Sequence, residues 1–167
     1  FLRISDSIRE TVAEARSKLS LNERFTVLYT GTLDKNKRPE LMLDLAAVCD
    51  AERFNFVLLG AGEMLEELRE RVVREKLSNV YLPGRVTDSL ALYFRASDVL
   101  LVPGRGGIVI SEGMAFGLPV VTHEADGTEY DLIQNGITGF ILEKGELSDF
   151  RNAIEFLQKN SGHSAEM

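Results

Sequence analysis

The sequence predicts a doubly wound α/β domain with about six parallel strands and helices on both faces of the sheet. Short apolar runs, many of them β-branched, recur along the chain, and each is closed by Gly, Pro or a polar turn. Amphipathic patterns with helical spacing fill the gaps between these runs. Apolar strands that alternate with helices are typical of a parallel sheet whose two faces are both covered.

The expected elements begin with a polar, weakly amphipathic helix over residues 5–19, for which Ser5 or Asp6 is available as the cap. The expected strands are Phe25–Thr30, Phe54–Leu59, Val80–Leu82, Val99–Val102, Pro119–Thr122 and Phe140–Leu142. The expected helices cover residues 39–49, 63–76, 88–95, 107–116, 128–134 and 148–159. Ligands bind at the carboxyl ends of the strands in such sheets, which points to the loops after residues 30, 59, 82, 102 and 122.

The helix over residues 63–76 illustrates an ordinary surface helix. Its apolar positions Leu65, Leu68, Val72 and Val73 are expected to face the sheet. Its charged positions are spaced for exposed ion pairs between Glu67 and Arg71 and between Glu70 and Arg74. These charges are interpreted as a solvated face.

Composition excludes several classes of partner. At 167 residues and 44% hydrophobic content, the chain is long enough for one domain with a substantial core. The net charge of −7 argues against nucleic acid or an anionic membrane as the main partner. A single cysteine, Cys49, allows no internal disulfide, and with only His123 and His163 as histidines no soft-ligand metal cage is expected. A reducing, cytoplasmic setting follows as the default.

The chain is expected to divide into three parts. Residues 1–24 form a leading helix or linker, residues 25–160 form the folded domain, and residues 161–167 form a disordered tail. No apolar run approaches the roughly twenty residues that span a bilayer. The chain begins at Phe1 rather than at methionine, which suggests a fragment of something longer.

Residues 98–123, DVLLVPGRGGIVISEGMAFGLPVVTH, carry the strongest functional signal. A buried strand is followed by a glycine-rich loop at 104–107 and by a helix that starts near Gly107, so bare amides and a positive dipole end face the loop. Glu112 lies one turn inside that helix and points back toward the loop, because helical side chains lean toward the N-terminus. The corner is therefore interpreted as an anion site with a carboxylate able to accept hydrogen bonds from ribose hydroxyls.

Two other loops offer cations at the same edge. After the first strand, Lys35, Lys37 and Arg38 stand just before a helix, where cations oppose the dipole unless an anion neutralises both. After the third strand, Arg85 could bind phosphate or pair with an acid, and the backbone near Arg85 and Val86 could contact a nucleobase.

The loop after the second strand, Gly60-Ala61-Gly62, only begins like a dinucleotide fingerprint. Leu65 stands where the third glycine of that fingerprint belongs. A tight strand-to-helix turn explains these glycines better than a nicotinamide cofactor does.

With these residues in place, the chain resembles the C-terminal, nucleotide-sugar-binding domain of retaining GT-B glycosyltransferases of family 4 (GT4, group 1), over about residues 20–160. Its landmarks arrive in the order of that family: YTGTLDKNKRPELML, FVLLGAGE, NVYLPGRV, GRGGIVISEGMAFGLPVVTH and GTEYDLIQNGITGFIL. The resemblance implies a Rossmann-like domain that forms one half of a GT-B fold. A branch of surface-polysaccharide and capsular transferases shows the same PG-x-x-G segment.

The resemblance also implies roles for individual residues. Lys37 matches the lysine that neutralises the donor diphosphate and is the expected catalytic residue, residues 107–109 match the helix start whose amides meet the phosphates, and Glu112 matches the glutamate that holds the ribose. Thr32 stands where many members have an arginine, and Gly104 stands where they have a sugar-contacting glutamate; Arg105 or Arg38 could supply the missing cation. The expected donor-binding residues are Gly31, Thr32, Lys37, Arg38, Arg85, Val86, Gly104, Arg105, Gly106, Gly107, Ile108, Val109 and Glu112.

The activity implied is transfer of a sugar, as by a hexosyltransferase, from a nucleoside-diphosphate sugar to a glycan or lipid-linked acceptor, with retention and without a metal or other cofactor. The acceptor and any peripheral attachment at the inner membrane face would involve an N-terminal domain that this chain lacks, so the fragment alone is expected to be inactive. The base, the sugar and the acceptor are left open. Alternatives are a GT-B sugar-nucleotide epimerase or phosphorylase, a non-catalytic nucleotide-binding module of flavodoxin type, and a dinucleotide-binding domain.

Overall fold

A computed structural model describes residues 10–125 and 127–161 of the chain. Its strands pair in parallel in the order β3-β2-β1-β4-β5-β6. The strands are β1 (Phe25–Thr30), β2 (Phe54–Leu59), β3 (Val80–Gly84), β4 (Val99–Val102), β5 (Val120–His123) and β6 (Gly139–Leu142). The order reverses between β1 and β4, which is the switch point where doubly wound sheets bind their ligands. The predicted fold class is confirmed.

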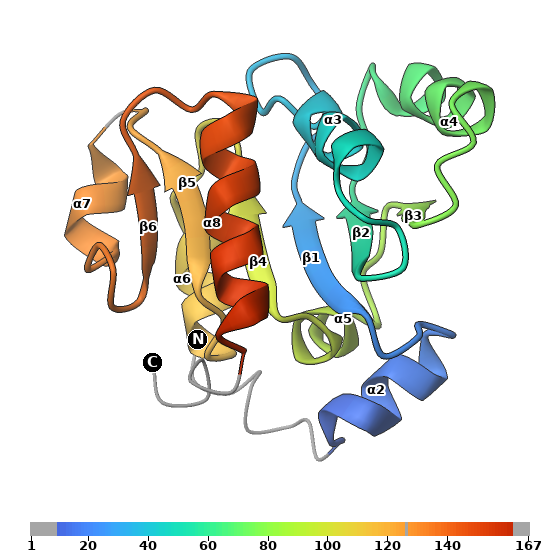
Figure 1. Cartoon of the computed structure of the whole chain (residues 1–167), viewed down its shortest axis with the longest axis horizontal. Helices are drawn as coiled ribbons and strands as arrows, with labels where there is room; N and C mark the ends of the chain where they lie inside the picture. The colour runs from blue at the N-terminus through green and yellow to red at the C-terminus, as the bar shows by residue number, and fades with distance from the viewer. Residues whose placement is uncertain (1–9, 126, 162–167) are drawn as a thin grey trace.

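The helices fall in the predicted gaps, with ends that differ by one or two residues. They are α3 (Glu40–Val48), α4 (Leu65–Arg74), α5 (Leu90–Ala96), α6 (Ile108–Ala115), α7 (Thr128–Leu132) and α8 (Leu147–Lys159). The helices α3 and α8 lie in front of the sheet in Figure 1, whereas α5 and α6 lie behind it.

Each face of the sheet has its own apolar core. On one face, side chains of α3, α4 and α8, such as Leu43 and Phe150, pack against Val27 and Phe56 of the sheet. On the other face, Ala15, Phe94 and Ile110 from α2, α5 and α6 pack against strand residues that include Leu100. The central strands β1, β2 and β4 are almost completely buried, as their continuous apolar sequences predict.

The first described helix is α2 (Val12–Lys18), and residues 10 and 11, which were predicted to be helical, are not. Thr11 is its N-cap, accepting a hydrogen bond from the Glu14 amide, while the Glu14 carboxylate accepts one from the Thr11 amide. This capping box fixes the first helical residue at Val12. The predicted caps Ser5 and Asp6 lie outside the described residues, as do residues 162–167 of the predicted tail.

The helix α2 is joined to the rest of the domain by a buried side chain, Arg16. Arg16 is 7% exposed and donates to Asp98 Oδ2 at 2.6 Å and to the carbonyl of Ala96 at 3.0 Å. Asp98 also accepts the Thr26 amide at 2.7 Å, so this ion pair joins α2 to the starts of β1 and β4. Figure 1 shows α2 beside α5 at this end of the sheet.

The helix α4 departs from its prediction in two respects. Leu68 is buried against the sheet, but Val73 is 77% exposed, so the apolar stripe is narrower than predicted. Its basic residues take partners other than the predicted ones: Arg69 pairs with Glu66, and Arg71 pairs with Glu75 and with Asp44 of α3. The contact with Asp44 depends on how the helices pack, which local spacing does not reveal.

Candidate functional site

A cavity of about 350 Å³ opens at the carboxyl ends of β1 and β4. Three segments contribute to it: the end of β1 with the loop that follows, the glycine-rich loop after β4, and the first turns of α6. The cavity is lined by Tyr29, Thr30, Gly31, Thr32, Lys37, Leu101, Val102, Pro103, Gly104, Arg105, Gly106, Gly107, Ile108, Val109 and Glu112. Most of the residues predicted for the donor site therefore share one cavity, although they come from distant parts of the sequence.

The loop after β1 is held in shape by two polar side chains. The hydroxyl of Tyr29 donates to the carbonyl of Thr32 at 2.7 Å. Asp34 Oδ1 accepts the amides of Asn36 and Lys37 at 2.9 and 3.2 Å, a side-chain turn that sets the backbone just before Lys37. Lys37 Nζ in turn donates to the carbonyl of Arg105, so the lysine side chain contacts the backbone of the glycine-rich loop.

The start of α6 presents unprotected amides to the cavity. The N-cap is Gly107, which has no side chain to cap them. The first amides of any helix lack intrahelical partners, and the positive end of the dipole lies beside them. Ile108 at this position is 71% exposed, and no acidic residue occupies the first turn. Together with Lys37, this helix start provides a local positive site on an acidic protein.

Glu112 completes the cavity from the interior of α6. It lines the same space as Lys37 and the glycine-rich loop, in agreement with the predicted direction of its side chain. Burial raises the pKa of the Glu112 carboxyl above its ordinary value. A carboxylate in this place can accept hydrogen bonds from hydroxyl groups, and it would repel a phosphate.

Gly104 is a glycine because two loops meet there. A Cβ on Gly104 would lie 2.3 Å from the carbonyl oxygen of Asn36 and 2.6 Å from the Cα of Lys37. Any side chain would therefore collide with the backbone of the loop after β1. The sequence suggested only loop flexibility and a missing glutamate at this position, because contacts between loops so far apart in the chain leave no local pattern.

The remaining predicted residues lie outside this cavity. Arg85 and Val86 line an adjoining cavity of about 370 Å³ that shares residues 30–32 with the first and reaches Leu59, Gly60 and Ala61. Arg38 lines neither cavity. Its guanidinium donates to the carbonyls of Pro103 and Gly145, so the structure does not place it as the substitute cation that the sequence suggested.

The glycines after β2 allow close approach of the loop after β1. A Cβ on Gly60 would lie 1.9 Å from the carbonyl oxygen of Gly31, and one on Gly62 would lie 2.3 Å from that of Leu33. The amide of Leu33 donates to Ala61, and the amide of Met64 donates to Leu33. Packing between neighbouring loops thus accounts for the partial glycine fingerprint.

Sequence reasoning missed the contribution of the strand ends themselves. Tyr29, Thr30, Leu101 and Val102 all line the first cavity, and Thr30 also lines the second. The signal that could have found them is their place at the carboxyl ends of the two strands that flank the switch point.

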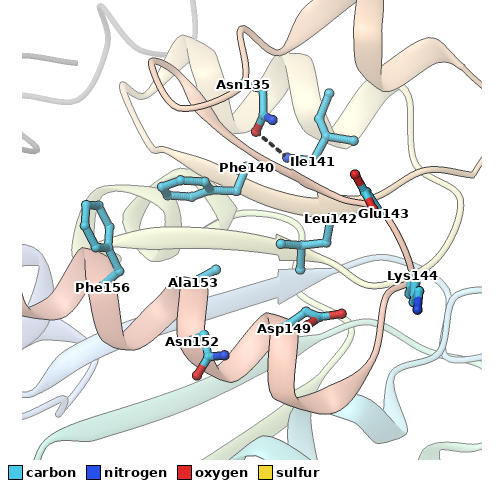
Figure 2. A pocket seen from close by; sticks show the side chains of 10 residues that line it. All are labelled: Asn135, Phe140, Ile141, Leu142, Glu143, Lys144, Asp149, Asn152, Ala153 and Phe156. Carbon is cyan, nitrogen blue, oxygen red and sulfur yellow. Dashed lines mark hydrogen bonds between the residues drawn. The ribbon is translucent and has the colours of Figure 1, made fainter.

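A larger hollow of about 650 Å³ lies apart from this site, between the edge strand β6 and α8. Figure 2 shows Phe140 and Phe156 facing each other at one end and Glu143, Lys144 and Asp149 gathered near the other. The amide of Ile141 donates to Asn135 Oδ1 at 3.0 Å. This groove contains no residue that the sequence singled out for binding.

The fold and the first cavity define a Rossmann-like domain with a cavity at its switch point. Residues 24–160 match the family of glycosyl transferases, group 1, and the chain belongs to this family. An uncharacterized glycosyltransferase of Methanocaldococcus jannaschii is 31% identical over 137 residues, which cover 80% of this chain and 38% of that protein. D-inositol 3-phosphate glycosyltransferase of Rhodococcus jostii is 31% identical over 168 residues, covering 92% and 37%.

Solved structures show the same architecture. Anabaena HepE in complex with UDP-glucose superimposes with a TM-score of 0.85 at 25% identity, covering 98% of this chain and 47% of that one. WaaG, a glycosyltransferase involved in lipopolysaccharide biosynthesis, gives a TM-score of 0.79 at 19% identity. The fold is therefore one half of a GT-B architecture, and the chain spans less than half the length of these proteins. Within residues 10–125 and 127–161, no helix has both the length and the apolar character needed to cross a membrane.

Proposed function

We propose that the domain binds the nucleoside-diphosphate part of a sugar donor and forms the donor half of a retaining glycosyltransferase. One observation carries the proposal: a single cavity brings together Lys37, the free amides at the start of α6, and Glu112. Lysine and amides suit a diphosphate, and the carboxylate suits the ribose hydroxyls beside it. Family membership supports the same assignment, and the HepE structure was determined with UDP-glucose.

In the proposed reaction, the bond between the anomeric carbon and the diphosphate oxygen breaks, with its electron pair left on the diphosphate. The acceptor hydroxyl oxygen bonds to that carbon with the same configuration, and its proton passes to the departing diphosphate. Negative charge then grows on the departing diphosphate. Lys37 and the amides of residues 106–109 are fixed where this charge appears, so they stabilise the transition state more than the ground state. We assign neutralisation of the charge on the diphosphate to these protein groups, without a metal ion. We assign binding of the acceptor to a part of the full-length protein beyond this chain.

Calorimetric titration with UDP, GDP, ADP and NAD tests the proposal. At least one nucleoside diphosphate is expected to bind, and NAD is not. Lys37→Ala and Glu112→Ala should each cost roughly 1.5–3 kcal/mol, or about one to two decades in affinity. Lys35→Ala is the matched control, because Lys35 is an exposed lysine of the same loop that does not line the cavity. The assignment fails if no diphosphate binds, or if the control weakens binding as much as the two site variants do.

A further inference from the structure

Arg38 occupies an unfavourable backbone conformation next to the proposed donor site. Its φ is +52°, in the left-handed region that side chains other than glycine's seldom adopt. The residue after it is Pro39, whose ring further restricts the backbone of the preceding residue. The other described non-glycine residues with positive φ, Ser20 and Lys76, follow the ends of α2 and α4, where left-handed residues commonly terminate helices. Arg38 instead precedes a helix, so helix termination does not explain its conformation.

The guanidinium of Arg38 joins three loops at the carboxyl edge of the sheet. From the loop after β1, Nη2 donates to the carbonyl of Gly145 at 3.0 Å, in the loop after β6. Nη1 lies 3.4 Å from the carbonyl of Pro103, at the start of the glycine-rich loop after β4. A Cβ on residue 145 would lie 3.2 Å from Nη1 and would crowd this contact. Gly145, which has no side chain, leaves room for it. The planar, forked guanidinium presents separate donors, Nη1 and Nη2, to the two carbonyls.

Lys37 and Arg38 hold the same loop on the two sides of Gly104. Lys37 Nζ donates to the carbonyl of Arg105, whereas Arg38 donates to that of Pro103. Gly104 between them packs directly on the backbone of Asn36 and Lys37. A diphosphate in the cavity would compete for Lys37 Nζ. Within the described residues, the hydrogen bond from Arg38 to Pro103 would then be the side-chain hydrogen bond that still joins these two loops.

We propose that Arg38 is a positioning residue that fixes the glycine-rich loop against Lys37, so that donor affinity depends on a guanidinium that does not line the donor cavity. This inference rests on the proposed function. Arg38 acts through Pro103 and Gly145, and the strained backbone persists because the two bonds require a side chain at this position.

Arg38→Gly separates positioning from a merely structural role. Glycine adopts a φ of +52° without steric strain, and this relief offsets the loss of the two hydrogen bonds. The melting temperature should therefore change little, whereas the Kd for UDP should rise about tenfold, which corresponds to about 1.4 kcal/mol. Arg38→Lys keeps the positive charge but not the fork, so it should weaken UDP binding about as much as Arg38→Gly. Lys35→Ala, which removes an exposed positive charge from the same loop, should leave the Kd unchanged.

Amide NMR of the chain without nucleotide gives an independent readout. Arg38→Gly should shift the resonances of Gly104 and Gly145 together, because both loops lose the same anchor. If wild type and Lys37→Ala behave as proposed but Arg38→Gly binds UDP as wild type does, the positioning role is wrong and the proposed function stands. Wild-type affinity in Arg38→Lys would show that charge alone matters, which also overturns positioning. Failure of wild type to bind any nucleoside diphosphate would instead defeat the proposed function.

Discussion

At the scale of single residues, the site combines groups whose direction a local rule predicts with groups that only tertiary contacts define. Glu112 is predictable, because a helical side chain one turn inside α6 points back toward the helix start. The loop pattern predicts cations before a helix at the ligand-binding edge of the sheet, and only the family resemblance distinguishes Lys37 from its neighbours Lys35 and Arg38. The bonds of Arg38 and the close approach at Gly104 join the loop after β1 to loops far along the chain, and no spacing in the sequence encodes them.

Replacement of Gly104 by alanine should destabilise the fold. The added Cβ would press on the Asn36 carbonyl and the Lys37 backbone, and overpacking of this kind costs about 1–3 kcal/mol of unfolding free energy. Urea unfolding of Gly104→Ala measures the loss. Gly107→Ala is the control, because a Cβ there meets Thr128 at 3.6 Å, an ordinary contact. Equal stability of the two variants would contradict the close approach of the loops. Gly104→Glu should be at least as unstable, and so should not supply a carboxylate for a sugar.

Glu112 should contribute to stability and to binding in opposite directions. Burial raises the pKa of its carboxyl, so ionisation is less favourable in the folded chain than in the unfolded one. The protonated group's stabilising contribution is complete below the unfolded pKa and is lost as the pH rises through the folded pKa. Glu112→Gln cannot ionise, so it should melt at a higher temperature than wild type at pH 7, and the difference should vanish below about pH 4.

The same Glu112→Gln variant should bind UDP more weakly at pH 7, because it loses the charged acceptor for the ribose hydroxyls. Melting scans across pH and UDP titration of one protein preparation measure both effects. A variant that is less stable than wild type at neutral pH would show that the Glu112 carboxylate is a structural partner rather than a group kept for a ligand.

At the scale of elements, apolar runs predicted the strands better than periodicity predicted the helix surfaces. The ends of β1, β2 and β4 match the prediction residue for residue, because buried parallel strands are apolar throughout and end abruptly at polar turns. Residues 10 and 11 are not helical as predicted, and the predicted ion-pair partners within α4 are wrong. The capping box at Thr11 fixes the start of α2. The ion pair between Arg71 and Asp44 depends on how α4 packs on α3, which local spacing does not encode.

The ion pair between Arg16 and Asp98 should be asymmetric in its effect on stability. Asp98→Ala leaves the buried Arg16 guanidinium without its 2.6 Å partner and removes the acceptor of the Thr26 amide, so it should cost about 3–5 kcal/mol. Arg16→Met should lower the free energy of unfolding by less. Burial already raises the pKa of Asp98, so its carboxyl can take up a proton once Arg16 is gone. Denaturant unfolding of both variants checks the order, and the reverse order would show that an unpaired Asp98 carboxyl costs more at this site than an unpaired Arg16 guanidinium does.

At the scale of the whole molecule, one edge of the sheet holds both the cavities and the residues that we propose bind the donor. The two adjoining cavities lie at the carboxyl ends of β1, β2 and β4, around the switch point in strand order. The topology predicts this location, because parallel strands bring all their carboxyl ends to the same edge. The chain's net charge of −7 makes the local positive site at this edge a property of a few placed groups rather than of the surface as a whole.

Nucleotide binding should survive removal of divalent metal. The proposal assigns diphosphate neutralisation to Lys37 and the amides at the start of α6, so UDP should still bind after dialysis against EDTA. Calorimetry with and without added MgCl₂ makes the comparison, with Lys37→Ala measured in both buffers. Complete loss of UDP binding in EDTA, restored by Mg²⁺, would show that a cation supplies the charge that we assign to the protein.

The chain alone should bind the donor without turning it over. It spans 38% of the relative from Methanocaldococcus jannaschii and 47% of HepE, and Ile108 beside the proposed phosphate site is 71% exposed. An open site leaves the leaving diphosphate in contact with water, which weakens the electrostatic stabilisation that transfer requires. Chromatography should therefore detect no release of nucleoside diphosphate by this chain from the sugar nucleotide whose diphosphate it binds, while a full-length form releases it when an acceptor is present. Release by the isolated chain that Lys37→Ala abolishes would show that the donor half is sufficient for bond cleavage.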